Sequence, residues 1–191
     1  MNDIPFCLGG IGDKRAGKGA AAAHLIKAHA ALHERFSTRI RELARRHRIP
    51  PTRENLQRLA MDLKEIFLED VLARPIVRAA QLAGGRGVFV EGIRYEEDST
   101  ILRGVFPRFK LIYVTASPRI RYERMLADPE NEGDRDLTFE QFLAQEQAGT
   151  EINIPRLGAL ADYKIVNEGT KEMLHARIDE IVAEQEAVAY G

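Results

Sequence analysis

Short apolar runs alternate along the chain with longer segments in which apolar residues recur at helical spacing. The first run covers residues 4–9 and stops at a cluster of glycines, and similar runs cover residues 87–92 and 111–115. Two further strands are predicted at residues 34–38 and 163–166. Uniformly apolar runs of this length are typical of buried parallel strands. We therefore expect a parallel sheet of about five strands.

Helices are predicted between these strands. One helix starts at the end of the first glycine-rich loop, because the residues after Gly19 are rich in alanine and contain no breaker. Thr52 can cap a later helix, and Ser117 precedes a proline at a first helical position. Thr138 and Gln141 form a capping-box pattern. Helical spacing also predicts a basic helix over residues 39–48, a helical stretch ending at residue 84, and a last helix with Leu174, Ile178, Ile181 and Val182 on one face.

This order of elements predicts a single three-layer α/β/α domain over residues 1–191. Residues 128–136 are charged and rich in helix breakers, so we expect a mobile loop there. In such sheets, ligands bind beyond the carboxyl ends of the strands. The loops that follow the strands are therefore the places to search for functional residues.

Composition narrows the function classes. The chain has 28 basic and 29 acidic residues and is 45% hydrophobic, which excludes a dedicated nucleic-acid-binding module, a coiled coil and a disordered tail. A basic run at residues 45–48 keeps nucleic-acid binding as a lesser alternative. No apolar run is long enough to span a bilayer and no signal-peptide pattern is present, so we expect a cytoplasmic protein without a membrane partner. Cys7 is the single cysteine and is expected in the core, and the sequence carries no mark of oligomeric state.

The loop after the first strand has the pattern of a phosphate-binding loop. It matches G-x-x-x-x-G-K, but the hydroxyl residue that usually follows is absent. Glycines let such a loop turn its N–H groups toward an anion, and a lysine at the helix start can reach the β- and γ-phosphates of a nucleotide. The alternative is a plain strand-to-helix turn with a solvated lysine. The candidate nucleotide-binding residues are Gly12, Asp13, Lys14, Arg15, Ala16, Gly17, Lys18, Gly19 and Ala20.

These residues resemble the P-loop nucleoside-monophosphate-kinase superfamily, whose adenylate-kinase members have Gly-Lys-Gly-Thr where this chain has residues 17–20. Within the superfamily, the whole length is similar to dephospho-CoA kinases, to phage deoxynucleoside monophosphate kinases and most of all to an archaeal group of dephospho-CoA-kinase-like ATPases. The shared segments are residues 90–94, 117–119 and 165–169. The resemblance implies a P-loop NTPase domain, an acceptor-binding helical region over about 37–83 and a small mobile lid over about 119–149.

The resemblance also implies ATP and Mg²⁺ as cofactors. Because Ala20 lacks the hydroxyl that helps to hold Mg²⁺ in the family, the metal would depend on Glu91, Asp13 or water. Glu91 ends an apolar strand, where it either holds Mg²⁺ or accepts the proton of an attacking hydroxyl; a capping or ion-paired glutamate is the alternative. Arg94 either grips the acceptor phosphate or pairs with Glu91.

Cations are expected around the transferred phosphoryl group, since charge stabilisation is most of the catalysis. Arg121 and Arg124 lie one helical turn apart and resemble lid arginines that contact ATP; the alternative is surface charges paired with Glu123 and Asp128. By similarity to phage deoxynucleotide kinases, candidate acceptor contacts are Arg41, Arg53 and Gln57. Candidate adenine contacts are Asn167 and Gly169.

The five histidines are all placed on predicted helices, without a second ligand type at metal spacing. His29 and His33 lie four residues apart, but no carboxylate or thiol completes a site, so a solvated face is expected. The sequence thus predicts an ATP-dependent kinase acting on a nucleotide or nucleotide-like small molecule. Dephospho-CoA phosphorylation is an alternative, as is a nucleotide-binding regulator or slow ATPase, which the alanine at position 20 favours.

Overall fold

The computed structural model describes residues 4–67, 69–129, 133–147 and 151–190 of the chain. Five strands form one sheet, in which every pair is parallel and the order is β2-β3-β1-β4-β5. The strands are β1 (Cys7–Gly12), β2 (Leu32–Arg35), β3 (Val88–Glu91), β4 (Phe109–Thr115) and β5 (Tyr163–Val166). The predicted parallel sheet is confirmed.

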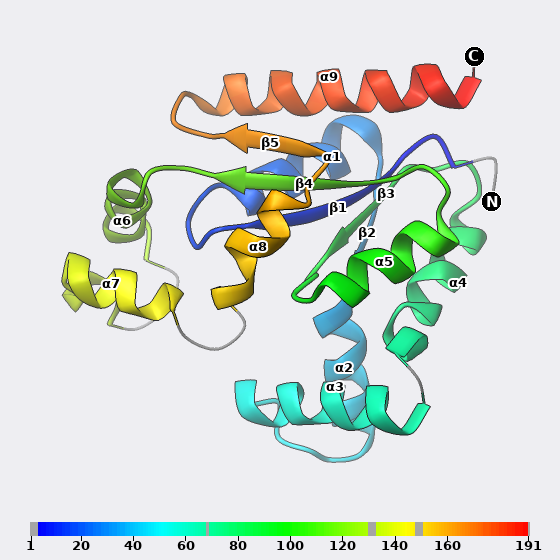
Figure 1. The fold of residues 1–191 in the computed structure, drawn as a ribbon, viewed down its shortest axis with the longest axis horizontal. Helices are drawn as coiled ribbons and strands as arrows, with labels where there is room; N and C mark the ends of the chain where they lie inside the picture. The colour runs from blue at the N-terminus through cyan, green and yellow to red at the C-terminus, as the bar shows by residue number, and fades with distance from the viewer. Residues whose placement is uncertain (1–3, 68, 130–132, 148–150, 191) are drawn as a thin grey trace.

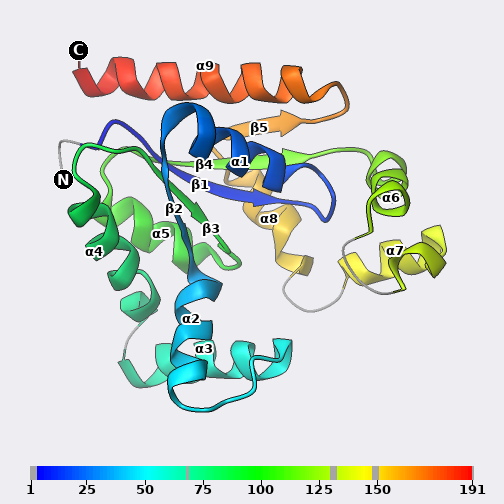
Figure 2. The ribbon, with the colours of Figure 1, turned by 180° about the vertical axis from the view of Figure 1, so that it is seen from behind.

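Helices cover both faces of this sheet (Figures 1 and 2). Within the described residues, three short 3-10 segments also occur, at Glu69–Leu72, Asp134–Asp136 and Glu151–Asn153. The α-helices are α1 (Lys18–His29), α2 (Phe36–Arg46), α3 (Arg53–Phe67), α4 (Arg74–Ala83), α5 (Glu96–Val105), α6 (Pro118–Ala127), α7 (Phe139–Glu146), α8 (Ile154–Ala159) and α9 (Lys171–Tyr190). In the described part of the chain, none of them has the length and apolar character that a membrane span requires.

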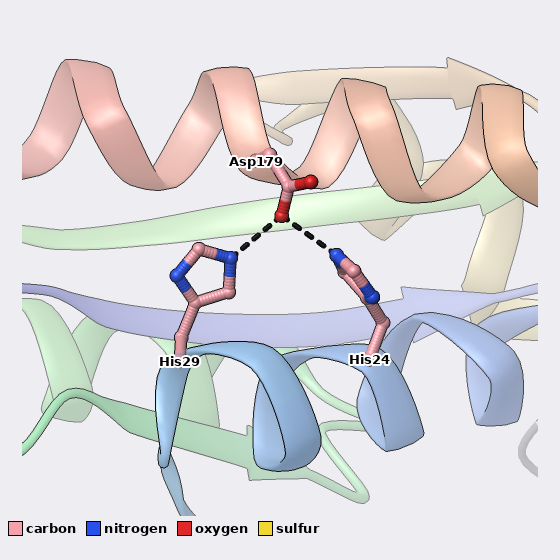
Figure 3. Close-up of side chains that lie close together, drawn as sticks. All are labelled: His24, His29 and Asp179. Atoms are coloured by element: carbon pink, nitrogen blue, oxygen red, sulfur yellow. Dashed lines mark hydrogen bonds and ion pairs between the residues drawn. The ribbon is translucent and has the colours of Figure 1, made fainter.

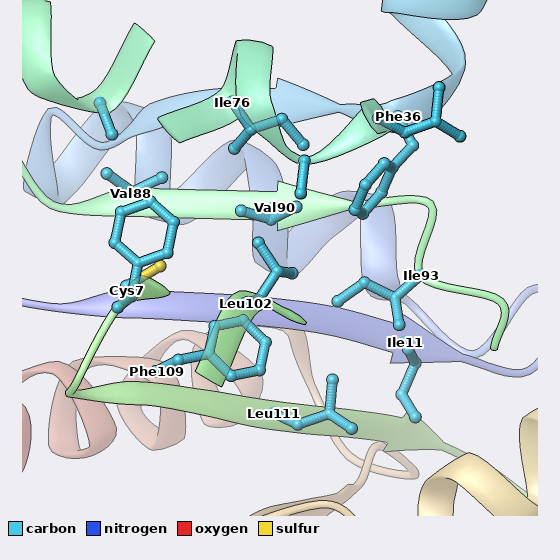
Figure 4. Close-up of a cluster of buried hydrophobic side chains, with 14 of the residues drawn as sticks. Cys7, Ile11, Phe36, Ile76, Val88, Val90, Ile93, Leu102, Phe109 and Leu111 are labelled. Carbon is cyan, nitrogen blue, oxygen red and sulfur yellow. The ribbon is translucent and has the colours of Figure 1, made fainter. Parts of the chain in front are cut away.

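Two apolar layers hold the helices to the sheet. On one face, α1 and α9 pack on β1, β3 and β4 through side chains that include Leu25 and Ile178, both fully buried. On the other face, α2, α4, α5 and α8 contribute to a second cluster around Cys7, Val90 and Leu111 (Figure 4). Burying one large aliphatic side chain contributes about 1.5–3 kcal/mol, so these two layers are the main source of stability. The three-layer α/β/α domain is confirmed.

Several local predictions are confirmed. The last strand has the predicted bounds, and Thr138 and Gln141 form the predicted capping box at the start of α7. Thr52 accepts a hydrogen bond from the N–H of Asn55 at the start of α3. Cys7 is buried in the core as expected.

The second strand, β2, lies earlier in the sequence than the predicted residues 34–38. β2 ends at Arg35, which pairs with Glu91 in the register of β3, and α2 begins at Phe36. Phe36 is 5% exposed and belongs to the core cluster as a helical residue. The first strand also lies three residues later than predicted, because its pairing with β3 and β4 runs from Cys7 to the loop. Helices α5 and α8 were not predicted.

Candidate functional site

The candidate site lies at the carboxyl ends of the strands. From β1 the chain runs to β2 at one edge of the sheet, and from β3 it runs to β4 on the other side of β1. The loops that leave the adjacent strands β1 and β3 therefore run in opposite directions. Such a change of direction marks the usual ligand position in open α/β sheets. The loop after β1 comprises residues 13–17, here called the glycine-rich loop, and the loop after β3 comprises residues 92–95.

The glycine-rich loop turns sharply into α1. Gly17 has φ 105°, a left-handed conformation that favours glycine. A Cβ at this position would overlap the side-chain amide of Asn167, which donates a 2.8 Å hydrogen bond to the carbonyl of Ala16. At the start of α1, the N–H groups of Lys18 and Gly19 have no intrahelical acceptor and add to the positive end of the helix dipole. The loop therefore presents donors to an anion.

Three side chains of the glycine-rich loop already have polar partners on other elements of the protein. Asp13 accepts hydrogen bonds from the hydroxyls of Tyr113, at 2.9 Å, and Thr115. The ammonium of Lys14 donates a 2.6 Å hydrogen bond to Gln145 on α7. The guanidinium of Arg15 donates to the carbonyl of Arg124 and lies 3.5 Å from a carboxylate oxygen of Asp128.

Arg121 and Arg124 on α6 hold the glycine-rich loop through its backbone carbonyls. Arg121 is only 4% exposed, pairs with Glu146 on α7 and donates to the carbonyl of Lys14 at 3.2 Å. Arg124 donates to the carbonyls of Ala16, at 3.4 Å, and Asn167, at 2.9 Å. Arg121 is thus no surface charge, and its carboxylate partners are Glu146 and, at 4.0 Å, Asp13. The expected contact of both arginines with ATP stays a prediction, since their donors here serve carbonyls and a carboxylate.

Lys18 begins α1 and carries the amine expected at phosphates. Burial lowers its pKa, and the positive charge of Arg94 lowers it further, whereas the nearby carboxylates of Glu91 and Glu151 act in the opposite direction. Among the residues that the structure describes, no carboxylate lies within ion-pair distance of this amine. Lys18 therefore has charged neighbours at longer range but keeps its donors for a ligand.

Glu91 at the end of β3 is 6% exposed and its ion pair is the alternative that the sequence left open. Its Oε2 atom accepts hydrogen bonds from His33 Nε2, at 2.8 Å, and Arg35 Nε, at 2.7 Å. Burial acts to raise the pKa of Glu91, but the hydrogen bond from His33 and the charges of Lys18 and Arg35 outweigh burial and lower the pKa to about 2. Glu91 is ionised at neutral pH.

Arg94 does not pair with Glu91. Its guanidinium lies 3.4 Å from Glu151, just before α8, so that alternative is wrong. Gly92 has φ 87° and turns the chain away from the sheet directly after Glu91. This turn directs Arg94 toward Glu151. The positive charge of Arg94 is still near enough to Lys18 to lower the pKa of its amine.

The donor set fits a magnesium ion held mainly by substrate. Both hydrogen bonds to Glu91 reach its Oε2 atom, and within the described ranges no hydrogen bond to Oε1 occurs. Mg²⁺ in phosphoryl-transfer sites takes one or two carboxylates, phosphate oxygens and several waters. Glu91 can supply the carboxylate, whereas Ala20 supplies no oxygen from its side chain.

The predicted acceptor residues lie on helices that project from the sheet. Arg41 on α2 and Gln57 on α3 are both exposed, and α2 and α3 extend away from the carboxyl ends of β2 and β3 (Figures 1 and 2). The side chain of Arg53 lies outside the described residues. The helical region over about 37–83 and the lid over about 119–149 stay predictions, and residues 130–132 of the expected mobile loop are outside the described part.

The expected adenine contacts lie after β5. Asn167 is 8% exposed, its N–H donates to the carbonyl of Thr115 at 2.7 Å and its carbonyl accepts from Arg124. Gly169 is exposed. Because both backbone groups of Asn167 have partners, Gly169 is the better placed of the two for a ligand contact, which stays a prediction.

The histidines correct one prediction. His33 lies on β2, not on a helix, and contacts Glu91. His24 and His29 on α1 meet Asp179 on α9, so a second ligand type does stand beside two histidines (Figure 3). Asp179 lies 150 residues from His29 in the sequence, so local spacing could not reveal it. The sequence analysis also did not predict the contact of Glu91 with His33 and Arg35. His33 and Arg35 are two residues apart on β2, so their side chains point to the same face of the sheet, and this spacing is visible in the sequence.

The parallel sheet and the glycine-rich loop after β1 together have the arrangement of a P-loop kinase-like fold. No family model matches the chain. The chain is 31% identical over 144 residues to a UPF0200 protein of Hyperthermus butylicus, with 75% of this chain and 76% of that one covered. It is 30% identical over 147 residues to a UPF0200 protein of Pyrococcus abyssi, with 75% and 78% covered. The chain belongs to the UPF0200 family.

Solved structures of similar fold include small-molecule kinases. A shikimate kinase from Bacteroides thetaiotaomicron has a TM-score of 0.57 at 13% identity, with 93% of this chain and 98% of that one covered. A gluconokinase from Sinorhizobium meliloti has a TM-score of 0.56 at 14% identity, with 98% and 97% covered. At these identities the likeness establishes the fold alone. It confirms the P-loop kinase fold that the sequence predicts.

Proposed function

We propose that this protein is an ATP-dependent phosphotransferase that moves the γ-phosphoryl group of ATP onto a nucleotide or nucleotide-like small molecule. The observation that carries the proposal is the position of Lys18. Its amine lies at the positive end of α1, directly after the glycine-rich loop, and is close enough to Glu91 and Arg94 for their charges to alter its pKa. A cation, helix N–H groups and an ionised carboxylate are what phosphoryl transfer requires.

The residues divide the work by charge. When bound, Mg²⁺ with ATP supplies the transferable phosphoryl group and neutralises part of its charge. The N–H groups of Lys18 and Gly19 and the Lys18 amine bind phosphate oxygens. With a pKa of about 2, Glu91 remains ionised and is a weak base at neutral pH, so it suits a metal ligand better than a general base.

The acceptor is proposed to bind between the carboxyl end of β3 and the projecting helices. The charge of Arg94 acts on Lys18, and its guanidinium can contact an acceptor phosphate after exchanging Glu151 for it. Arg41, Arg53 and Gln57 are proposed to hold the rest of the acceptor. Their number and charge favour an anionic acceptor, because arginine binds phosphate through two parallel hydrogen bonds.

The lid arginines are proposed to act in two states. In the present arrangement Arg121 and Arg124 hold the carbonyls of Lys14, Ala16 and Asn167. For Arg121 to stabilise the transferred charge, its ion pair with Glu146 must open. A phosphate can replace that carboxylate, since guanidinium binds both groups with the same fork geometry.

An ADP-release assay tests the proposal. The full chain is incubated with ATP and Mg²⁺ and a panel of ribonucleoside and deoxyribonucleoside monophosphates, dephospho-CoA, shikimate and gluconate. We expect ADP release to be stimulated by one compound of the panel that already carries a phosphate group. Lys18→Ala should abolish the stimulated rate, whereas Lys27→Ala on the exposed side of the same helix should not change it. Equal stimulated rates in the Lys18→Ala and wild-type proteins would contradict the proposal.

One observation favours a second candidate, a nucleotide-binding regulator or slow ATPase. Ala20 supplies no hydroxyl for Mg²⁺, and Arg121 and Arg124 hold the loop in one position. This candidate predicts that ATP binds but that ADP release is slow and independent of any acceptor in the panel. Ala20→Thr should then raise the rate of ADP release, since the threonine hydroxyl restores a metal contact.

A further inference from the structure

Two histidines of α1 and an aspartate of α9 meet at the interface between these two helices. His24 Nε2 and His29 Nε2 each lie 2.6 Å from the same oxygen, Oδ1 of Asp179 (Figure 3). All three candidate ligand atoms lie within 4.8 Å of one another. The side chains are 14%, 21% and 49% exposed, respectively, so the group sits at the edge of the helix interface with its aspartate toward water.

Packing around the imidazoles fixes their orientation. The ring of His24 stacks on that of His175, with centroids 4.0 Å apart and planes 8° from parallel. The ring of His29 packs edge-on against Phe6, with centroids 6.3 Å apart. Both imidazoles therefore present Nε2 to one point before any ligand binds. Such pre-organisation lowers the entropic cost of coordination.

The donor set is typical of a divalent transition metal. Two imidazole nitrogens and one carboxylate oxygen form the protein ligands of many zinc sites, with a fourth position left for water. At metal–ligand distances of about 2.0–2.2 Å, tetrahedral ligand atoms stand about 3.3 Å apart. The nitrogens would have to move away from Oδ1 by roughly 0.7 Å to reach this spacing. Rotation of the half-exposed Asp179 side chain can supply such a shift.

We propose that His24, His29 and Asp179 form a site for a divalent transition metal of the zinc class, which joins α1 to α9. The ion takes Nε2 of each histidine and one carboxylate oxygen, and water completes the tetrahedron. Mg²⁺ is excluded because it prefers oxygen ligands. Since α1 also begins with Lys18, the metal would tie the far end of that helix to the C-terminal helix.

Calorimetric titration of the untagged full chain with Zn²⁺, without nucleotide, tests this site. We expect one Zn²⁺ per chain. His29→Ala and Asp179→Ala should each weaken binding by more than about tenfold, because even the loss of an outer partner costs that much at metal sites. His47→Ala is the matched control, since it removes an exposed histidine that follows α2 and belongs to neither α1 nor α9, and it should leave affinity unchanged. Circular dichroism of each variant checks that it is folded.

A second probe reports the ligands directly. Co²⁺ in a tetrahedral site gives visible absorption bands, which we expect in the wild type and in His47→Ala but not in His29→Ala or Asp179→Ala. Absence of saturable Zn²⁺ binding in the wild type overturns the proposal. Equal Zn²⁺ affinity in all four proteins overturns it as well, because binding would then be adventitious. Neither outcome depends on kinase activity, so the proposed function can fail while this site stands.

Discussion

Gly17→Ala perturbs the conformation on which the phosphate-binding proposal depends. The backbone of Gly17 has φ 105° and ψ 11°, where an alanine is strained by about 1–3 kcal/mol. The new Cβ also displaces the amide of Asn167 from the carbonyl of Ala16, and the loss of this buried hydrogen bond costs about 1 kcal/mol. We expect the free energy of unfolding to fall by about 2–4 kcal/mol in total.

Gly19→Ala is the matched control, two residues away in the same loop-helix junction. Gly19 lies in the first turn of α1, and no heavy atom within 4 Å would meet its Cβ. Alanine is a better helix former than glycine by up to about 1 kcal/mol, so this variant should be as stable as the wild type or more stable. The two substitutions have the same chemistry but opposite expected signs.

Urea unfolding followed by far-ultraviolet circular dichroism measures both changes, since the chain has no tryptophan for fluorescence. In the thermal transition, the loss in Gly17→Ala corresponds to a Tm lower by about 5–15 °C for a chain of this length. Gly17→Ala combined with Asn167→Ala should cost about 1 kcal/mol less than the sum of the single variants, because the same hydrogen bond is lost in both. A Gly17→Ala protein as stable as the wild type would refute the loop geometry.

Three other perturbations test separate parts of the structure. Glu91 has a folded-state pKa of about 2 against an ordinary 4.5, so its ionised carboxylate stabilises the fold by up to about 3 kcal/mol above pH 4.5. The stability lost in Glu91→Gln should therefore shrink as the pH falls from 4.5 to 2. A difference in urea unfolding between the two proteins that does not depend on pH would contradict this. Arg121→Ala leaves Glu146 without its partner and should lower the free energy of unfolding by about 2–4 kcal/mol in the same assay. Arg119→Ala, at an exposed position of the same helix, should lower it by less than about 1 kcal/mol. Equal losses in the two variants would contradict the buried ion pair. Burial raises the pKa of the Cys7 thiol, so a thiol reagent should modify it only after unfolding, and rapid reaction of the native protein would contradict its position in the core.

Features with local causes were predictable from the sequence. The capping box at Thr138 and the strand over Tyr163–Val166 each depend on a few neighbouring residues, and both are confirmed. The glycine-rich loop was found for the same reason, since strand, loop and helix follow one another directly. The three-layer fold could be predicted because apolar runs of strand length alternate with helical spacing.

Features set by distant partners could not be predicted. The end of β2 is fixed by the pairing of Arg35 with Glu91, which lies far along the chain, so local spacing extended the strand too far. For Arg121 the sequence offered ATP contact or pairing with Glu123 and Asp128, because nothing near it in sequence points to Glu146 on another helix. In the same way, only the packing of α9 on α1 brings Asp179 to the histidines.

The most direct test of the central claim follows the phosphoryl group itself. ATP labelled with ¹⁸O at the γ-phosphate is incubated with the protein, Mg²⁺ and the acceptor panel, and every product is identified by mass spectrometry. We predict that the label appears in one phosphorylated acceptor, together with ADP, and that Lys18→Ala abolishes this product. Label found only in inorganic phosphate, or left entirely in ATP, would contradict a phosphotransferase.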